Sequence, residues 1–490
     1  MKVCIGYPPL ESDKGTPLLS QNRQFQWFNR STYIYPVVPA SAATLLKENG
    51  YDVIWEDGIA QQITYEDWIH CCEDIDILAM ETKTPVIKKH WEIVNDIKTR
   101  YPELIVVLMG DHVTALPDES MNECSVDYIL TGGDYDFLLL NLMDNLSSGV
   151  ELEPGIWYRN NSNDSIVNTG LFELNHDLNT LPFIDRDLSC WKMYSKYNGN
   201  YKSLPGTYTM AGRDCWYHKC KFCSWTTLYP KFRVRTPESL LDEVGMLIER
   251  YGVKDIMDDT GTFPVGDWLR TFCEGMIERG YNKKVAMHCN MRVNALNREE
   301  YQLMGKAGFR FILFGLESAN QNTLDRIDKG FKVKDVALAC KMAKEAGLDP
   351  HLTVMMGYPW ESFDDAQHTI NLAKDIFKKG WADTLQATIM IPYPGTPLFE
   401  WCRDEGLLNT VDWDRYDMRE PIMKCEMSED DIKGLTQELY KVFFNFNYVA
   451  RRIVTIRNVD DLRFIKRGIR SVAGHLSDFS GKKGKSSRNI

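Results

Sequence analysis

Short apolar segments alternate with stretches of helical periodicity over most of this 490-residue chain. Strand and helix that repeat in this order are typical of a parallel sheet covered by helices on both faces. The sequence therefore predicts an α/β fold that begins with a Rossmann-like domain at residues 1–150. Five strands are expected in this domain, at residues 3–5, 52–55, 75–80, 104–109 and 128–130.

The alternation resumes after residue 203 with longer helices. Together with a strand that leads into a cysteine-rich loop, apolar segments at 256–257, 285–287, 311–314, 352–356 and 385–391 make six strand–helix units. Six units predict a partial, TIM-like (β/α)6 barrel at residues 204–410, with its chemistry on the loops that follow the strands. Three further parts are expected: a connector at 151–203, a small mainly helical region at 411–475, and a disordered basic tail at 476–490.

Three cysteines lie close together near the start of the second domain. Cys215, Cys220 and Cys223 have the spacing C-x4-C-x2-C. An odd number of thiols cannot all pair as disulfides, and thiolate-rich sites select zinc or iron–sulfur clusters. A structural zinc ion needs a fourth ligand, for which only His218 lies nearby, and a loop histidine more often faces solvent or substrate. A [4Fe-4S] cluster on three cysteines, which leaves one iron open, is therefore favoured over structural zinc.

The triplet resembles the cluster loop of radical S-adenosylmethionine (radical SAM) enzymes, with Phe222 as the aromatic residue before the last cysteine. That family usually has C-x3-C-x2-C, so this loop carries one extra residue. The segments 314–318 (FGLES), 357–362 (GYPWES) and 392–397 (PYPGTP) are similar to further motifs of the family. The resemblance covers about residues 1–410 and implies reductive cleavage of S-adenosylmethionine (SAM) at the open iron.

Polar residues follow the predicted barrel strands, and parallel strands end at the same end of a barrel. Taken alone, each would more often be a loop turn or a surface charge. The resemblance makes them SAM contacts: Glu317 and Ser318 for the ribose or amino-acid end, and Arg292 for the carboxylate. Asp258 and Asp259 would contact the amine or the substrate. The set expected to bind SAM is Phe222, Asp258, Asp259, Arg292, Gly315, Glu317, Ser318 and Gly357; no residue is assigned a further catalytic role.

The loops after the N-terminal strands contain no G-x-G-x-x-G, so a dinucleotide is not expected. Residues 110–114 (GDHVT) and 132–134 (GGD) instead resemble loops of the cobalamin-binding domain that precedes the barrel in one radical SAM subgroup. The imidazole of His112 could approach the cobalt, but a loop histidine that bonds to backbone is the favoured reading. The glycines could instead be required by turns. The resemblance implies cobalamin held by Pro8, Thr82, Gly110, Asp111, His112, Thr114, Gly132 and Gly133.

These cofactors imply an enzyme that methylates an unactivated carbon of a small molecule. The family also implies an external electron donor such as flavodoxin or ferredoxin. A cyclisation, rearrangement or carbon–carbon bond formation on the same scaffold is the alternative, because fold and cofactors do not fix the reaction. A metal or cobalamin sensor without catalysis is a third reading.

Charge and hydropathy limit which partners are expected for this chain. The net charge of −12 disfavours nucleic-acid binding. Residues 451–490 nevertheless hold eleven Lys and Arg against three Asp, and a basic amphipathic helix there could rest on an anionic membrane or dock on the acidic body of the protein. Membrane contact would suit a lipid-like substrate; a natural-product intermediate is the other expectation. Aromatic residues between 440 and 448 are expected to pack rather than bind substrate.

No stretch reaches the roughly 18 apolar residues of a membrane span, and no secretory leader is recognised at the start of the sequence. Thirteen cysteines in such a chain indicate a reducing compartment. We therefore expect a cytoplasmic protein.

Overall fold

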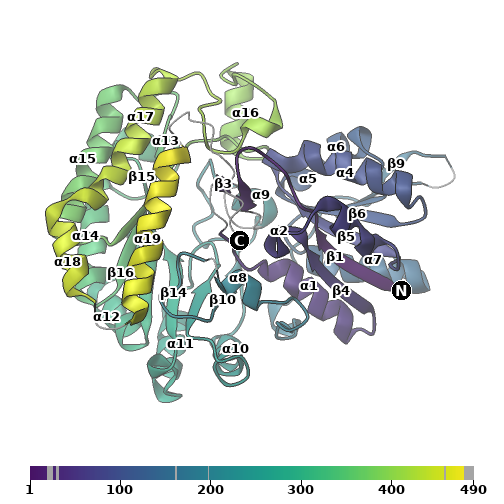
Figure 1. Ribbon diagram of the computed structural model, residues 1–490, viewed down its shortest axis with the longest axis horizontal. Helices are drawn as coiled ribbons and strands as arrows, with labels where there is room; N and C mark the ends of the chain where they lie inside the picture. Colours follow the sequence, from purple (N-terminus) through teal and green to yellow (C-terminus); the bar gives the residue numbers. More distant parts are fainter. Residues whose placement is uncertain (19–25, 29–31, 161–162, 197, 457–458, 479–490) are drawn as a thin grey trace.

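Two sheets organise the protein (Figure 1), and loops that follow strands of both line one cleft. The structure is a computed structural model that describes residues 1–18, 26–28, 32–160, 163–196, 198–456 and 459–478. The first sheet belongs to the N-terminal domain and the second to the barrel. The loops between and around the sheets form the candidate site.

The N-terminal sheet has the strand order β4-β1-β5-β6-β7-β8-β9. The first five strands are parallel and confirm the Rossmann-like prediction, whereas β8 and β9 pair antiparallel at one edge. These last two strands lie in the stretch predicted as a connector, so that stretch extends the sheet. The strands are β1 (Lys2–Tyr7), β4 (Asp52–Asp57), β5 (Ile77–Thr82), β6 (Ile105–Gly110), β7 (Tyr128–Leu130), β8 (Ile156–Arg159) and β9 (Ile166–Asn168).

Helices cover both faces of this sheet, as its fully buried central strands require. Three long helices, α1 (Val37–Glu48), α4 (Ile87–Arg100) and α7 (Tyr135–Ser148), have buried apolar faces. The shorter elements are β2 (Thr16–Leu18), β3 (Gln26–Phe28), α2 (Gly58–Gln61), α3 (Tyr65–Trp68), α5 (Asp111–Ala115), α6 (Pro117–Glu123) and α8 (Lys192–Lys196).

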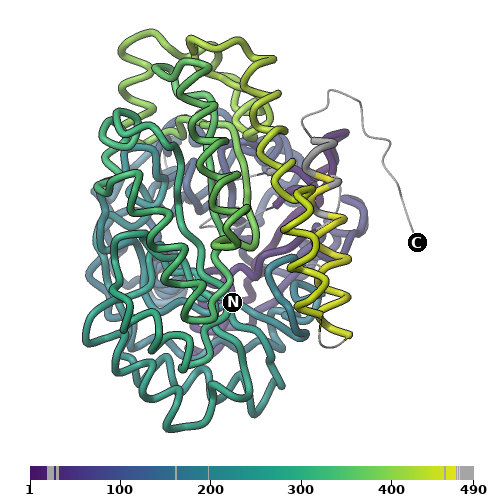
Figure 2. Tube along the Cα trace, turned by 90° about the vertical axis from the view of Figure 1, so that its left-hand side faces the viewer, coloured from purple at the N-terminus to yellow at the C-terminus, as the bar shows by residue number. Residues whose placement is uncertain are grey.

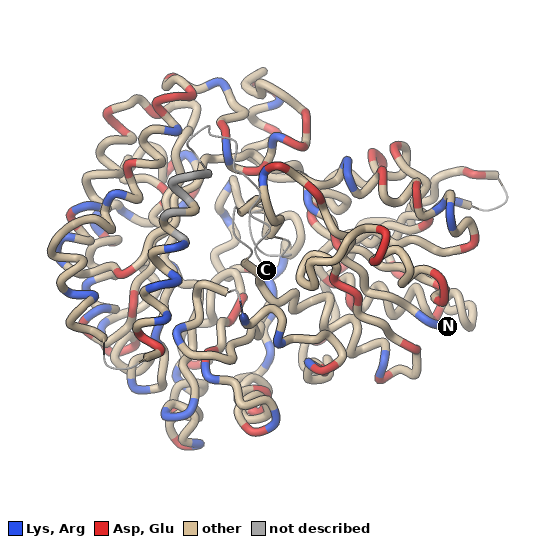
Figure 3. The backbone as a smooth tube through the Cα atoms, viewed as in Figure 1, with Lys and Arg blue, Asp and Glu red and all other residues tan. Residues whose placement is uncertain are grey.

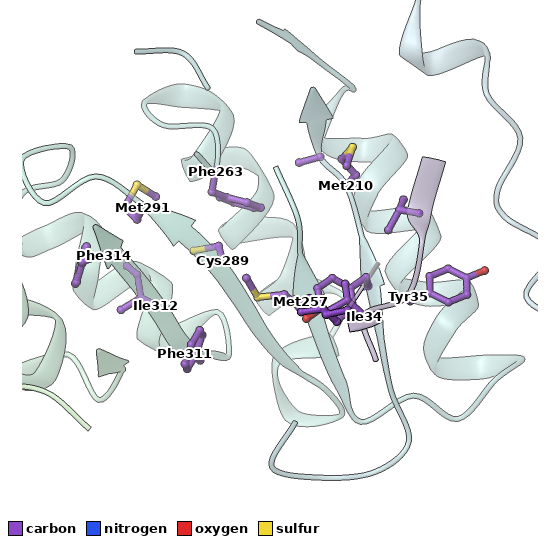
Figure 4. Close-up of a cluster of buried hydrophobic side chains, with 14 of the residues drawn as sticks. Ile34, Tyr35, Met210, Met257, Phe263, Cys289, Met291, Phe311, Ile312 and Phe314 are labelled. Carbon is purple, nitrogen blue, oxygen red and sulfur yellow. The ribbon is translucent and has the colours of Figure 1, made fainter. Parts of the chain in front are cut away.

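The barrel sheet has six parallel strands in chain order, which confirms the predicted partial barrel. They are β10 (Gly206–Thr209), β13 (Asp255–Asp258), β14 (Ala286–Met291), β15 (Phe309–Glu317), β16 (Asp349–Met356) and β17 (Thr384–Ile389). Apolar side chains from consecutive strands, including Met257, Cys289 and Ile312, contribute to one core (Figure 4). A row of helices packs outside the sheet: α10 (Pro237–Glu249), α11 (Asp267–Glu278), α12 (Arg298–Lys306), α13 (Gln321–Arg326), α14 (Val333–Glu345) and α15 (Phe363–Lys379).

Local signals place the ends of these helices. Asn297 and Ser362 form capping boxes with Glu300 and Asp365 at the starts of α12 and α15. Gly380 ends α15 in the left-handed conformation that glycine adopts without strain. A two-stranded ribbon of β11 (Gly212–Arg213) and β12 (Arg233–Val234) flanks the cysteine loop and the short helix α9 (Trp225–Leu228).

The C-terminal region is helical, as predicted, and its last helix docks on the body of the protein. It contains α17 (Glu429–Tyr440), α18 (Phe446–Val454) and α19 (Val459–Asp478), and it follows α16 (Pro397–Asp404), which lies in the stretch assigned to the barrel. Figure 2 shows α19 alongside the barrel, and this helix contacts α17 and β3. Asp461 pairs with Lys202 at 2.5 Å, and Arg467 donates to the carbonyl of Tyr201 at 2.6 Å. The docking contacts therefore differ from the predicted attraction between a basic helix and an acidic body.

No described helix combines the length and apolar character needed to cross a bilayer. The predicted disordered tail lies outside the described residues from position 479 onward.

Candidate functional site

The cysteine loop begins directly after β11, at the barrel end where the strands finish. Asp214 and His218 have positive φ angles of 72° and 50°, which give the loop two sharp changes of direction. Backbone bonds fix its middle: the N–H of Lys221 donates to Ile327 at 3.0 Å, and the carbonyl of Lys221 accepts from Leu398 at 2.9 Å. The left-handed residue His218 lies within the C-x4-C half of the loop, the half that carries the extra residue.

His218 is already engaged within the loop, because its Nδ1 contacts the buried carboxyl of Asp214. Burial raises the pKa of Asp214 to about 6, although the contact with the imidazole opposes this rise. The contact uses only one of the two ring nitrogens, and His218 itself lines the same cleft as the cysteines. That the three cysteines act without the histidine stays a prediction.

Cys215, Cys220 and Cys223 line one cleft. Burial raises the pKa of Cys220 and of Cys223, so both are neutral thiols when no metal is present. The Sγ of Cys215 lies 2.9 Å from the hydroxyl of Thr262. Metal binding requires thiolates and releases their protons, so a positively charged cluster would reverse these raised pKa values.

Among the described residues, no three His, Cys, Asp or Glu side chains are gathered tightly enough to hold a single ion. Each cysteine of an iron–sulfur cluster binds a different iron atom, so its thiols surround the cluster without meeting at one point. Three cysteines that share one cleft fit this donor set better than they fit one tetrahedral zinc ion.

Glu317 lies at the end of β15, beside the cysteines. Its Oε1 accepts from Lys329 Nζ at 2.6 Å, and both side chains line the cleft. The backbone of Glu317 has a φ of 60°, and the register between β15 and β16 shifts at Gly315 and Glu317. A bulge of this kind re-aims a side chain at the end of a strand. The irregularity therefore turns Glu317 into the cleft.

Arg292 enters the same cleft from the end of β14. Its guanidinium lies 3.4 Å from the centre of the Tyr217 ring and donates to the carbonyl of Lys329. Its Nε is buried and has no hydrogen-bond partner in the described structure. A planar cation held in this way can present its remaining donors to a carboxylate. The position agrees with the contact predicted for the amino-acid end of SAM.

Four of the residues predicted to contact SAM are not among those that line the cleft. Asp258 accepts from the N–H groups of Ala211 and Thr260, and burial raises its pKa to about 7. Ser318 donates to Glu361 at 2.5 Å beneath the loop. Asp259 and Gly357 are likewise absent from the lining, which contains Phe222, Arg292, Gly315 and Glu317 from the predicted set.

The loops after β6 and β7 are closed by side chains from the N-terminal domain and from more distant parts of the chain. His112 is fully buried, with its Nδ1 3.2 Å from Thr84 and its Nε2 3.1 Å from Glu119. Trp413, from the C-terminal region, packs edge-on against the same ring. His112 thus bonds to the side chains of Thr84 and Glu119 and not to backbone as predicted.

The predicted glycines of this end face protein atoms. A Cβ added to Gly132 would lie 2.5 Å from Phe172, and one added to Gly133 would lie 1.7 Å from Tyr229. A Cβ on Gly110 would lie 2.3 Å from a backbone oxygen of β5. The remaining predicted residues are also engaged or buried within the domain. Thr82 bonds to His90, Thr114 bonds to Gly110 and Gly132, and Asp111 pairs with Lys83. Pro8 is buried.

A buried ionic network joins this end to the cysteine loop. Arg213, two residues before Cys215, pairs with Asp134 at 2.6 Å and with Asp136 at 2.5 Å. Arg233 and His176 pair with Asp134 as well. Removal of one charge from such a buried group leaves the others uncompensated, so the network holds the two domains in one orientation.

The cleft has a volume of about 2430 Å³ and extends from the cysteines through the barrel to the C-terminal helices. It meets the N-terminal domain at Pro9 and Gly58, just after β1 and β4. Ligands of open α/β sheets bind beyond the carboxyl ends of the strands. The cleft therefore reaches the expected edge of the first sheet, but at β1 and β4 instead of at the loops after β6 and β7.

Sequence reasoning missed several residues of the site. Lys329, Tyr217 and Thr262 contact Glu317, Arg292 and Cys215 respectively. Lys329 lies within a segment that resembles the family downstream of residue 318, and its charge was the only available signal. The pairing with Glu317 depends on how the loop after β15 folds back, which spacing alone does not reveal.

Comparisons with known proteins agree with this geometry. Residues 211–373 match the radical SAM superfamily. A Pyrococcus horikoshii protein named as an uncharacterized methyltransferase is 28% identical over 89% of this chain and 93% of its own length. The anaerobic magnesium-protoporphyrin IX monomethyl ester cyclase of Cereibacter sphaeroides is 27% identical over 77% of this chain and 62% of its own length.

The solved structure of OxsB has the same overall fold. OxsB is described as a cobalamin-dependent S-adenosylmethionine radical enzyme with aqua-cobalamin and S-adenosylmethionine bound. The match has a TM-score of 0.69 at 15% identity and covers 97% of this chain and 72% of the OxsB chain. The predicted arrangement of a cobalamin-binding-type domain before a radical SAM barrel is therefore confirmed at the level of the fold.

Proposed function

We propose that this chain, which belongs to the radical SAM superfamily through residues 211–373, cleaves SAM reductively and methylates an unactivated carbon of a small molecule with the help of cobalamin. The observation that carries the proposal is the convergence of Cys215, Cys220, Cys223, Arg292 and Glu317 on one cleft at the strand ends of a partial barrel. When bound, the cluster, SAM and cobalamin supply radical chemistry and a transferable methyl group.

The three cysteines would hold three corners of a [4Fe-4S] cluster and leave the fourth iron to SAM. Arg292 would bind the carboxylate of SAM, because its buried Nε has no partner and its ring contact fixes the guanidinium plane. Glu317 would bind the amine, with Lys329 holding its carboxylate in place. Phe222 lies beneath Lys329, whose Nζ is 5.3 Å from the ring centre.

Cobalamin is supported by the likeness to OxsB and by the reach of the cleft to Pro9, Leu10 and Gly58. These three residues are among those of the N-terminal domain that line the cleft and would face it. The eight residues predicted from sequence remain a prediction, since His112, Gly132 and Gly133 already contact protein atoms. We infer further that a flavodoxin or ferredoxin supplies the electron and that the protein works in the cytoplasm.

The test is anaerobic reconstitution with iron, sulfide and cobalamin, followed by assay of the products formed from SAM. Formation of both 5'-deoxyadenosine and S-adenosylhomocysteine supports methylation. Deoxyadenosine alone favours the second candidate, a non-methylating radical reaction, to which the similarity with a cyclase also points. No cleavage of SAM by the reduced protein would leave only the sensor reading.

Cysteine variants locate the cluster. We expect Cys220→Ala to lose nearly all the iron and the cleavage of SAM, because each thiolate holds its own iron. Cys190→Ala is the matched control, since Cys190 is exposed and outside the cleft. Equal iron content in the two variants would refute the proposed site.

A further inference from the structure

Large apolar side chains near the end of the chain line the cleft while remaining open to solvent. Ile453 of α18 and Ile469 of α19 are 61% and 66% exposed, and both belong to the lining. Phe444, Val449 and Ile456 share these two properties. Apolar groups that gather at one place on a protein surface mark a binding site more often than an accident of folding. We call these five residues, with Arg452, Arg467 and Arg470, the C-terminal wall.

Apolar residues of the N-terminal domain also line the cleft. Leu10, Leu18 and Ile34 are buried, and Phe28 lies in β3, which contacts α19. A ligand that covers both sets of residues would remove apolar surface from water on each, at roughly 25 cal/mol for each Å² covered. The shape and lining of this part of the cleft therefore suit an apolar body that is larger than a metabolite made only of polar groups.

Cations accompany these apolar groups, although the chain as a whole carries a net charge of −12. Arg452, Arg467 and Arg470 line the C-terminal wall, and Figure 3 shows the basic residues that recur along α19. Arg452 has a carboxylate partner, Asp383, at 3.3 Å. Arg467 has none within ion-pair distance among the described residues, and its guanidinium donates only to the carbonyls of Tyr201 and Lys202.

Arg467 is therefore a half-buried cation that has no ion-pair contact among the described residues, although the carboxylates of Asp255 and Asp460 favour its charge from a greater distance. Its Nε is fully covered and lacks a hydrogen-bond partner in the described structure. Burial lowers its pKa, in keeping with the cost of removing a cation from water. An anionic ligand at this position would offset that cost and accept a charge-assisted hydrogen bond. The same helix keeps Arg463 out of the cleft, beside Asp460.

We propose that the C-terminal wall binds an amphiphilic substrate, with its apolar body against Ile453, Ile456 and Ile469 and a carboxylate or phosphate group on Arg467. This inference rests on the proposed function, because it names the class of molecule that the same cleft presents to the cluster. The anionic group could be carried by a lipid or by a soluble amphiphile; both have the chemistry that the wall recognises.

The docking contacts of α19 keep the wall in place. Asp461 pairs with Lys202, and the ring of Phe464 packs on Arg310 with 5.4 Å between the guanidinium carbon and the ring centre. Arg310 itself pairs with Asp255 and Asp349, so it is already neutralised. The charge available to a ligand at this end of the cleft thus belongs to α19.

Binding can be measured directly with 11-(dansylamino)undecanoic acid, an anionic amphiphile whose fluorescence rises in an apolar site. The reconstituted full chain is titrated with this probe. We expect Ile453→Asp to weaken binding about tenfold, because a carboxylate would replace an apolar contact and repel the probe. Val454→Asp should change it by less than about twofold, since Val454 is the neighbouring exposed residue outside the cleft. Equal effects of the two variants would overturn the proposal.

A second pair of variants isolates the charge. Arg467→Gln should weaken the binding of the acid about fivefold and leave the methyl ester of the probe within about twofold, because only the acid carries the group that Arg467 binds. Arg463→Gln should affect neither probe. An Arg467→Gln variant that binds acid and ester equally less well would mean that the residue acts on structure alone, which refutes the assignment of the anionic group.

Competitors distinguish the source of the anion. Dodecyl phosphate should displace the probe at a concentration about tenfold lower than inorganic phosphate does, because the alkyl chain adds buried apolar area. Equal potency of the two competitors would overturn the proposal that the ligand is an amphiphile. Sedimentation with phosphatidylglycerol vesicles covers the remaining alternative: binding to vesicles that Val454→Asp and Ile453→Asp abolish equally would make the helices a membrane contact instead of a substrate wall.

The same preparation separates this inference from the proposed function. Probe binding needs no reduced cluster, whereas cleavage of SAM does. Cleavage of SAM without saturable probe binding would refute the proposed amphiphilic substrate and leave the proposed radical SAM function intact. Saturable probe binding that follows the two variant pairs, without any cleavage of SAM, would support the wall and refute the function.

Discussion

Loops that follow strands of both sheets line one cleft, yet the strand ends of the two sheets differ in what they contact. In the barrel, Arg292, Gly315 and Glu317 open into a cleft of about 2430 Å³. In the N-terminal domain, His112 and Thr82 bond to neighbouring side chains, and rings of the protein fill the space in front of Gly133. Both ends carry the polar and glycine-rich loops expected of ligand sites in parallel sheets.

This difference teaches that a loop pattern predicts where a site can form, and that packing decides whether the site is open. Tyr229, which faces Gly133, comes from the segment after the cysteine loop. Trp413, which packs on His112, comes from the C-terminal region. The N-terminal end is thus closed by distant parts of the chain, which no local motif reports.

The largest effect is expected where the two ends are joined. Arg213→Met should lower the free energy of unfolding by about 3–5 kcal/mol, because it leaves the buried carboxylate of Asp136 without its cation and removes one of the two arginines that pair with Asp134. Urea denaturation measures this change. Arg250→Met is the control, since its pair with Asp187 is exposed and should contribute less than about 1 kcal/mol. A loss as small as that of the control would mean that the domains do not depend on the network.

Buried carboxyl groups beneath both ends should make stability depend on pH in the same direction. Burial raises the pKa of Glu81 and of Glu361 to about 7 from an ordinary value of 4.5. Between these values the folded protein holds a proton that the unfolded chain has lost. Each group therefore contributes stability that is present below pH 4.5 and is lost as the pH rises through about 7.

Replacement of either glutamate by glutamine removes its pH-dependent contribution to stability. We expect the loss of stability between pH 5.5 and pH 8 to shrink by on the order of 2 kcal/mol in Glu81→Gln and in Glu361→Gln, and by both amounts together in the double variant. The groups lie in different domains, so their effects should add. Urea unfolding at several pH values measures this loss of stability. A wild-type stability that rises with pH over this range would contradict the raised pKa values of the two glutamates.

Two glycines, one at each end, should respond differently to a methyl group. Gly133→Ala should cost about 2 kcal/mol of stability, because its Cβ would lie 1.7 Å from the fully buried Tyr229. Gly315→Ala meets only the flexible ends of Glu317 and Lys329, at 2.1 and 2.7 Å. It should change stability by less than about 1 kcal/mol and weaken SAM binding about fivefold. The reverse pattern would mean that the N-terminal end is the open one.

The last prediction concerns His112, whose replacement should not change the cobalamin spectrum. We expect His112→Asn to lower stability by about 1–2 kcal/mol, because the ring loses its contacts to Thr84 and Glu119. The absorption spectrum of bound cobalamin should stay the same, since a buried and paired imidazole is not available to the cobalt. A spectral shift in this variant would instead show that the histidine leaves its partners when cobalamin binds.

The sequence allowed the strands and the barrel to be predicted because their apolar segments are continuous. Residues 104–109, for example, correspond to β6 at Ile105–Gly110. The cysteines were predictable because their spacing is local. Ser318 and Asp258 were placed at the correct strand ends, but their side chains turn into the protein to meet Glu361 and Ala211.

Long-range contacts account for what was missed. The edge strands β8 and β9 pair antiparallel with a parallel sheet, which alternation of strand and helix does not predict. Lys329 reaches Glu317 only because the chain folds back after α13. The cleft-lining role of Ile453 and Ile469 depends on where α18 and α19 dock, so their sequence reads equally well as a surface helix.

The position of Arg213 limits how this protein could acquire a new substrate. Its side chain is held by two aspartates of the N-terminal domain, and its backbone leads within two residues to Cys215. Substitutions near the first thiol would therefore disturb the spacing between the domains, whereas α18 and α19 lie far along the chain from this junction. Divergence among relatives should accordingly collect in the last helices, where a change of specificity leaves the inherited reaction geometry untouched.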